Sequence, residues 1–183
     1  DGGVHSELPG ELKVNRASDN FRFLTTWQTS AYFSLQRSGG ELTSSGNFRP
    51  LSPILNMEEM GKLGDTVGIS ADRDFIYWAI DEGTNIHIYK GRETIVNGQL
   101  RWQWSPWIFL GTRTCVGIRV IYHTGTDRRL WFGYTLGTDY ITGYVILSEN
   151  TLADSAARYA SSGWLRMSYT YGTDPIFDKL WQS

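Results

Sequence analysis

Two acidic side chains, Asp81 and Asp139, are candidates for acid–base chemistry in this sequence. Glycoside hydrolysis needs two carboxylates at a set distance, and neighbouring repeats of one chain could supply one each. Acids at the ends of strands are more often solvated. The sequence also contains no Gly-x-Ser-x-Gly elbow, His-Glu-x-x-His helix, phosphate-binding glycine loop or dinucleotide fingerprint. It therefore favours a protein that is not an enzyme, with a glycoside-acting enzyme as one alternative.

A second candidate site is aromatic. Trp102 and Trp104 are two residues apart, so they share one face of an extended strand. If exposed, such a pair forms a stacking platform for sugar rings and predicts a carbohydrate-binding protein. If buried, the same rings fill the space between neighbouring repeats, which the pattern favours. Pro106 interrupts strand pairing, so Trp107 need not continue the alternation.

Metal and cofactor binding are not expected. A Gly-Thr-Asp/Asn element recurs at Gly83, Gly125, Gly137 and Gly172. Its oxygens could bind a cation such as calcium, but the same residues are what tight hairpin turns require, and turns are favoured. His5, His87 and His123 are too far apart for a local metal motif. His87 lies between Ile86 and Ile88, so it points away from the face that these two share.

The composition predicts an all-β globular chain. Of the 183 residues, 40% are hydrophobic, 20% are charged and 14% are aromatic, and aromatic side chains suit a pleated sheet. The formal net charge of −2 comes without a basic run, so nucleic acid is not an expected partner. The apolar runs are far shorter than the roughly 20 residues of a membrane helix, so a membrane is not expected either. Cys115 is the single cysteine, which excludes an internal disulfide.

The chain repeats itself with a period near 50 residues. Val67-Gly68-Ile69 recurs 49 residues later as Val116-Gly117-Ile118, and Gly83-Thr84-Asn85 recurs 54 residues later as Gly137-Thr138-Asp139. A more degenerate copy precedes them. We expect an irregular arm over residues 1–20, then blade-like units over 21–61, 62–111 and 112–171, and the start of another unit at 172–183.

Apolar runs of strand length, separated by Gly, Asn, Asp and Ser, predict a series of hairpins. These predicted strands are Phe21–Trp27, Ala31–Leu35, Thr66–Ser70, Phe75–Ile80, Asn85–Tyr89, Trp104–Leu110, Gly117–Tyr122, Leu130–Tyr134, Ile141–Leu147 and Trp164–Tyr169. Short helical turns are expected at 54–61 and 151–160. The alignment matches residues 76–78 with 130–132 and residues 86–89 with 141–144, and we expect Trp78 and Trp131 to occupy equivalent buried positions.

Four short strands in each period of about 50 residues are typical of β-propeller blades. One meander has two faces and cannot bury both alone, so it stacks on its neighbours. The Leu130–Tyr134 strand, the Gly-Thr-Asp turns and the closing strand led by Trp164 resemble the propeller-like repeats of large tail and fibre proteins of bacteriophages, over roughly residues 65–183. This resemblance implies a non-enzymatic structural or interaction module in a virion or outside a cell.

About three blades cannot complete a ring, because propellers need four to eight. An open array leaves apolar terminal faces. We therefore expect these faces to be covered by other protein subunits or by the rest of a longer chain. A glycan is a further expected partner under the carbohydrate-binding alternative.

Overall fold

The computed structural model describes residues 18–53, 64–123 and 128–148. These residues form eleven strands: β1 (Leu24–Trp27), β2 (Ser30–Leu35), β3 (Ser38–Thr43), β4 (Phe48–Pro50), β5 (Asp65–Ala71), β6 (Ile76–Asp81), β7 (Ile86–Val96), β8 (Gln99–Gly111), β9 (Thr114–Tyr122), β10 (Arg128–Leu136) and β11 (Asp139–Ile146). The predicted all-β class is confirmed. In the described part of the chain, no helix has the length and apolarity needed to cross a bilayer.

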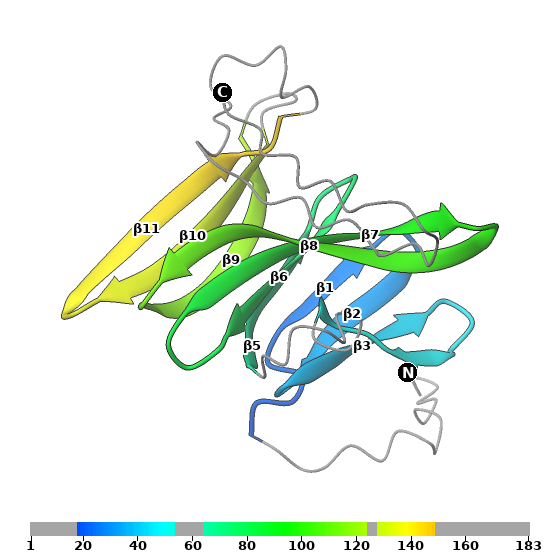
Figure 1. The fold of residues 1–183 in the computed structure, drawn as a ribbon, viewed down its shortest axis with the longest axis horizontal. Coiled ribbons are helices and arrows are strands. Elements are labelled where there is room, and N and C mark those ends of the chain that lie inside the picture. The colour runs from blue at the N-terminus through cyan, green and yellow to red at the C-terminus, as the bar shows by residue number, and fades with distance from the viewer. Residues whose placement is uncertain (1–17, 54–63, 124–127, 149–183) are drawn as a thin grey trace, which may run out of the picture. The chain divides into compact units, whose positions relative to one another are not determined.

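The strands form three antiparallel meanders, in which neighbours in the sheet are also neighbours in the chain (Figure 1). Sheet A contains β1–β4, sheet B contains β5–β8, and sheet C contains β9–β11. Hairpins therefore make every connection within a sheet, as the pattern of apolar runs predicts. The described sheets do not close into a ring, so a propeller arrangement stays a prediction.

Each predicted strand that falls within the described residues overlaps an observed one. The predicted strand at Trp164–Tyr169, the helical turns at 54–61 and 151–160 and the last unit at 172–183 lie outside the described residues. Most of the predicted arm over residues 1–20 also lies outside the described residues, which begin at residue 18. The sheets span residues 24–50, 65–111 and 114–146, and the proposed unit boundaries beyond them stay predictions.

Sheet A is a regular four-stranded meander, although its repeat is degenerate in sequence. The sequence pattern does not predict β3, because Gly39 and Gly40 are typical of a turn. Both glycines are buried within the strand. A Cβ atom at Gly39 would lie 2.2 Å from the ring of Trp78, and one at Gly40 would lie 2.2 Å from the ring of Phe48. These glycines therefore admit aromatic rings that no larger residue could accommodate.

Sheet B is buried on both faces. Along β6, five consecutive side chains from Ile76 to Ile80 are buried. Because side chains alternate along a strand, Ile76, Trp78 and Ile80 join one hydrophobic cluster with residues of sheet A, and Tyr77 and Ala79 join another with residues of sheet C. Sheet B is thus packed between its two neighbours.

The first strand of sheet B, β5, forms hydrogen bonds with both neighbouring sheets. The backbone N–H of Val120 in β9 donates to Ser70 Oγ in β5, at 2.8 Å. Thr66, also in β5, donates through its backbone N–H to the carbonyl oxygen of Gln36 at 2.7 Å and through its hydroxyl to that of Ser38 at 3.2 Å. Polar contacts therefore connect β5 to both neighbouring sheets.

The repeat is visible in the backbone as a recurring β-bulge. Pairing between β5 and β6 shifts between Thr66 and Gly68, and pairing between β9 and β10 shifts at the corresponding place, beside Gly117. A Cβ atom at Gly68 would lie 2.9 Å from a side-chain carbon of Ile118, so the two bulged segments are in close contact. The Val-Gly-Ile motif therefore marks a bulge at the junction between sheets B and C.

The strand register corrects the expected equivalence of Trp78 and Trp131. Ile69 pairs with Trp78, and Ile118, its counterpart in the repeat, pairs with Phe132. Trp78 therefore corresponds to Phe132, and both are buried. Trp131 faces the other way and is only partly buried.

The same register corrects the alignment of the following strands. Trp78 pairs with Tyr89, whereas Phe132 pairs with Gly143, so Tyr89 corresponds to Gly143 and not to Tyr144. The alignment of residues 86–89 with 141–144 is thus wrong by one position. A slip of one residue moves every side chain of a strand to the opposite face.

Candidate functional site

The hairpin of β7 and β8 carries the candidate site. Its strands have 11 and 13 residues and are joined by Asn97 and Gly98, whose φ angles are 52° and 75°. Positive φ at both positions is typical of the two-residue turn that suits twisted hairpins. The sequence prediction ended the first strand at Tyr89 and began the second at Trp104, because polar residues separate them. The Asn-Gly dipeptide is the sequence feature that could have revealed the longer hairpin.

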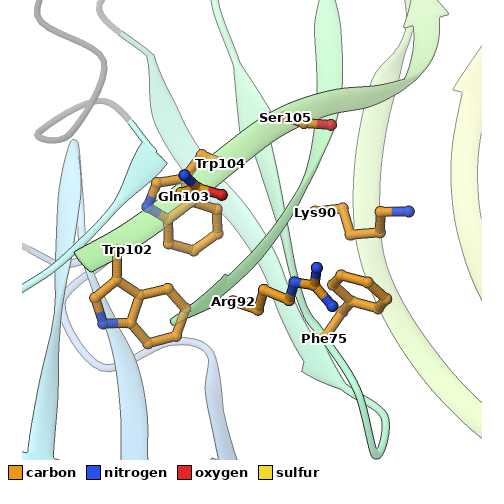
Figure 2. Close-up of a pocket in the computed structure, with 7 residues that line it drawn as sticks. All are labelled: Phe75, Lys90, Arg92, Trp102, Gln103, Trp104 and Ser105. Atoms are coloured by element: carbon orange, nitrogen blue, oxygen red, sulfur yellow. The ribbon is translucent and has the colours of Figure 1, made fainter. Parts of the chain in front are cut away.

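A hollow with a volume of about 590 Å³ lies against this hairpin. Its lining residues are Phe75, Lys90, Arg92, Trp102, Gln103, Trp104 and Ser105 (Figure 2). This volume falls within the range of small-molecule sites, roughly 300–1,000 Å³. The predicted ligand-binding residues Trp102 and Trp104 are both among the lining residues, whereas sequence reasoning did not select Lys90 and Arg92.

Four polar side chains of the hollow form a two-by-two array. Lys90 pairs with Ser105, and Arg92 pairs with Gln103. Cross-strand partners share a face, and so do residues two apart on one strand. The ammonium, guanidinium, hydroxyl and amide groups therefore belong to the same face of the hairpin.

Aromatic rings hold the two cations of this array. The Lys90 ammonium lies 4.5 Å from the centre of the Phe75 ring and 5.4 Å from that of Trp107. The guanidinium carbon of Arg92 lies 5.2 Å from the centre of the Phe75 ring, and Figure 2 shows these two groups side by side. Burial, and then the neighbouring charge of Arg92, lowers the pKa of Lys90 below its ordinary value. Two positive charges thus share one aromatic ring.

The predicted Trp102–Trp104 pair is present and packs between sheets A and B. The two rings stack at 5.3 Å with an interplanar angle of 16°. Trp102 lies 5.6 Å from Trp27, and Trp104 meets Trp78 edge-on at 5.8 Å. Both tryptophans are half-buried, so they contribute to the core as well as to the wall of the hollow. Their role in binding a ligand stays a prediction.

The pairing confirms the expected interruption at Pro106. Tyr89 pairs with Pro106 and Ile88 pairs with Ile108, so Trp107 is the extra residue of a bulge. It leaves the alternation of the preceding tryptophans and packs on Tyr77, at 5.3 Å between ring centres.

In the described part of the chain, no hydrogen bond joins Asp81 to Asp139, the alternative catalytic pair. Asp81 closes the turn after β6 by accepting the backbone N–H of Gly83 at 2.8 Å. Asp139 begins β11 and is exposed. The structure thus gives Asp81 a role in a turn.

The expected turns and the His87 orientation are observed. Gly83 and Gly137 have φ angles of 87° and 63° in hairpin turns, whereas Gly125, Gly172 and His5 lie outside the described residues. His87 is on the face opposite Ile86 and Ile88, with its Nδ1 3.2 Å from Glu82 Oε1. His123 is exposed. Within the described residues, no three His, Cys, Asp or Glu side chains gather into a group that could hold a metal ion.

Comparison of the chain with protein-family models, curated proteins and solved structures found no match. Two features of the described residues bear on function. One is the stacking of the sheets and the faces that it leaves exposed. The other is the cationic, aromatic hollow beside the β7–β8 hairpin.

Proposed function

We propose that this chain is a non-enzymatic structural and interaction module, a stack of blade-like sheets whose terminal faces are covered by neighbouring subunits or by further units of a longer chain. The observation that carries the proposal is the contrast between sheet B and its neighbours. Sheet B is covered on both faces. Sheets A and C each have exposed apolar side chains on the face away from sheet B.

The exposed face of sheet C is aromatic. Trp131 pairs with Tyr144 across β10 and β11, so both side chains are on the face opposite Phe132. Their rings lie 4.8 Å apart, and Tyr144 is 47% exposed. Ile121 and Tyr140 are on the same face by register and are 44% and 86% exposed. Such a surface is typical of a contact with another protein.

The exposed face of sheet A is apolar as well. Leu24 pairs with Phe33 and is 65% exposed. Phe33 itself is buried, because its ring lies 4.9 Å from that of Phe21 and stacks on that of Phe48 at 5.9 Å. Phe21 itself is 45% exposed. A second apolar patch therefore exists on the face of sheet A that does not pack on sheet B.

The described sheets suggest what covers such faces. Sheet B buries its two faces against other sheets, and its first strand, β5, is hydrogen-bonded to both of them. This packing supports the proposal, because the blades of a propeller also bury their faces against neighbouring sheets. Further blades, from a longer chain or from other copies, would bury the outer faces of sheets A and C in the same way.

The resemblance of residues 65–183 to propeller-like repeats of bacteriophage tail and fibre proteins supports a location in a virion. Mass spectrometry of purified virions from the source of this sequence tests this location. Peptides of the chain are expected among the structural proteins of the particle. Their absence from intact particles would overturn the virion assignment and leave an extracellular interaction module.

Sedimentation velocity over a range of protein concentrations, combined with hydroxyl-radical footprinting, tests the module itself. We expect association that grows with concentration, with falling oxidation of Leu24 and Tyr144. Leu24→Glu and Tyr144→Glu should weaken this association, whereas Ser45→Glu, in an exposed turn of sheet A, should not. A chain that stays monomeric at every concentration, with both residues constantly oxidised, would overturn the proposal.

A further inference from the structure

The hollow beside the β7–β8 hairpin has the chemistry of a binding site for a negatively charged ligand. We propose that it binds an acidic oligosaccharide whose carboxylate or sulfate group contacts Lys90 and Arg92. This site is on sheet B, away from the outer faces of sheets A and C. It therefore does not depend on the proposed assembly.

The polar groups of the hollow are suited to an anion. Lys90 and Arg92 can only donate hydrogen bonds, and no acidic residue is among the lining residues. In the described part of the chain, no carboxylate lies within 4.0 Å of either cation. Since the whole chain carries a net charge of −2, this positive charge is a local feature. A bound anion would compensate both cations at once.

An acid near the hollow, Asp72, already has other partners. Asp72 is close enough to influence the pKa of Lys90. Its carboxylate, however, accepts the backbone N–H groups of Asp74 and Phe75, each at 2.7 Å, and the hydroxyl of Tyr77 at 3.0 Å. It also lies 3.4 Å from the guanidinium of Arg128. Asp72 is therefore committed to the turn and to Arg128, and the two cations of the hollow stay available.

The remaining lining residues favour a sugar as the carrier of the charge. Phe75 brings an aromatic ring, and such rings stack on the C–H groups of sugar rings. Trp102 and Trp104 pair with Glu93 and Gly91, so their rings lie on the other face of the hairpin and close the hollow from that side. Gln103 and Ser105 are exposed and can both donate to and accept from hydroxyl groups. The four polar side chains project from the face of the hairpin and not from its free edge. A ligand here therefore contacts side chains, unlike a peptide that adds a strand to a sheet.

Isothermal titration calorimetry of the whole chain at physiological salt tests the proposal. The probes are an oligogalacturonate, a heparin-derived hexasaccharide, neutral maltohexaose and an oligoglutamate peptide. We expect at least one of the two acidic saccharides to bind, and the one that binds identifies the charged group as carboxylate or sulfate. The neutral saccharide and the peptide should bind at least about tenfold more weakly, since they lack the charge or the sugar hydroxyls.

Matched variants locate the binding. Lys90→Gln and Arg92→Gln remove the charge but keep a polar side chain, and each should weaken binding by about tenfold or more, because a hydrogen bond to a charged group is lost. Arg101→Gln, on the same hairpin but outside the hollow, should leave affinity unchanged. Thermal unfolding of each variant establishes that it is folded.

Three results would overturn the proposal. The first is the absence of binding of either acidic saccharide. The second is equal binding to the wild type and to a folded Lys90→Gln/Arg92→Gln double variant. The third is equal or tighter binding of the peptide or of maltohexaose. None of these results affects the sedimentation test of the assembly, so the two proposals fail independently.

Discussion

The guanidinium of Arg128 lies 3.0 Å from the carboxylate of Asp74, across the junction between sheets B and C. Arg128 begins β10, and its side chain is only 4% exposed. Its second acidic neighbour, Asp72, is also buried. The ionic cluster therefore fixes the β5–β6 turn to sheet C.

Replacing Arg128 by Met should destabilise the fold by about 3 to 5 kcal/mol, because Asp72 would be left as a buried charge without its cationic partner. The free energy of unfolding in urea measures the effect. Arg37→Met is the matched control, since Arg37 forms an exposed pair with Asp65 at 3.8 Å. That change should cost less than about 1 kcal/mol. Equal losses for the two variants would contradict this account of the junction.

The strand register predicts which aromatic residues contribute most to the free energy of unfolding. Trp78→Ala and Phe132→Ala should each cost about 3 to 5 kcal/mol, because both rings are buried at equivalent positions. Trp131→Ala should cost clearly less, because its ring is partly exposed. Denaturant unfolding of the three variants supplies the comparison. A loss for Trp131→Ala as large as that for Trp78→Ala would instead support the expected equivalence of Trp78 and Trp131.

Gly39→Ala tests the close contact between sheets A and B. The added methyl group would lie 2.2 Å from the Trp78 ring and 2.6 Å from the carbonyl oxygen of Phe33. We expect a loss of about 1 to 3 kcal/mol from overpacking, with weaker near-ultraviolet dichroism from the tryptophans. Ser45→Ala, in an exposed turn of the same sheet, should change stability by less than about 0.5 kcal/mol. An unaffected unfolding midpoint for Gly39→Ala would refute the contact.

Alkaline pH should destabilise the protein through its buried tyrosines. Burial, and then the charge of Glu82, raises the pKa of Tyr89 from 10.0 to about 12. Burial also raises the pKa values of Tyr32 and Tyr77. A raised pKa means that the unfolded state loses its proton first, so the stabilisation is complete below pH 10 and is lost as the pH rises towards about 12.

Denaturant unfolding between pH 10 and about 12 measures this loss. Tyr89→Phe should reduce the dependence of stability on pH in this range, because phenylalanine has no hydroxyl proton to lose. Tyr140→Phe should not, since Tyr140 is 86% exposed. If the slope for Tyr89→Phe equals that of the wild type, Tyr89 is not one of the linked groups.

Local patterns in the chain were enough to predict the all-β class, the series of hairpins and the recurrence of the Val-Gly-Ile motif, whereas the bulge at this motif came from the strand pairing. Alternation and turn chemistry act over a few residues, so they can be read without knowing what packs against a strand. The same local logic placed Trp102 and Trp104 on one face and Pro106 at the interruption.

Contacts between distant parts of the chain decided the rest. From the sequence, Gly39 is typical of a turn, but in the structure it lies in a strand and leaves the space that the Trp78 ring occupies. Asp72 pairs with Arg128, which is 56 positions away in the chain. Lys90 and Arg92 became candidate site residues because hairpin pairing places them opposite Ser105 and Gln103. Register assigns each side chain to a face, and a difference of one residue reverses that assignment. Only the paired strands could therefore distinguish the buried Trp78 from the partly exposed Trp131.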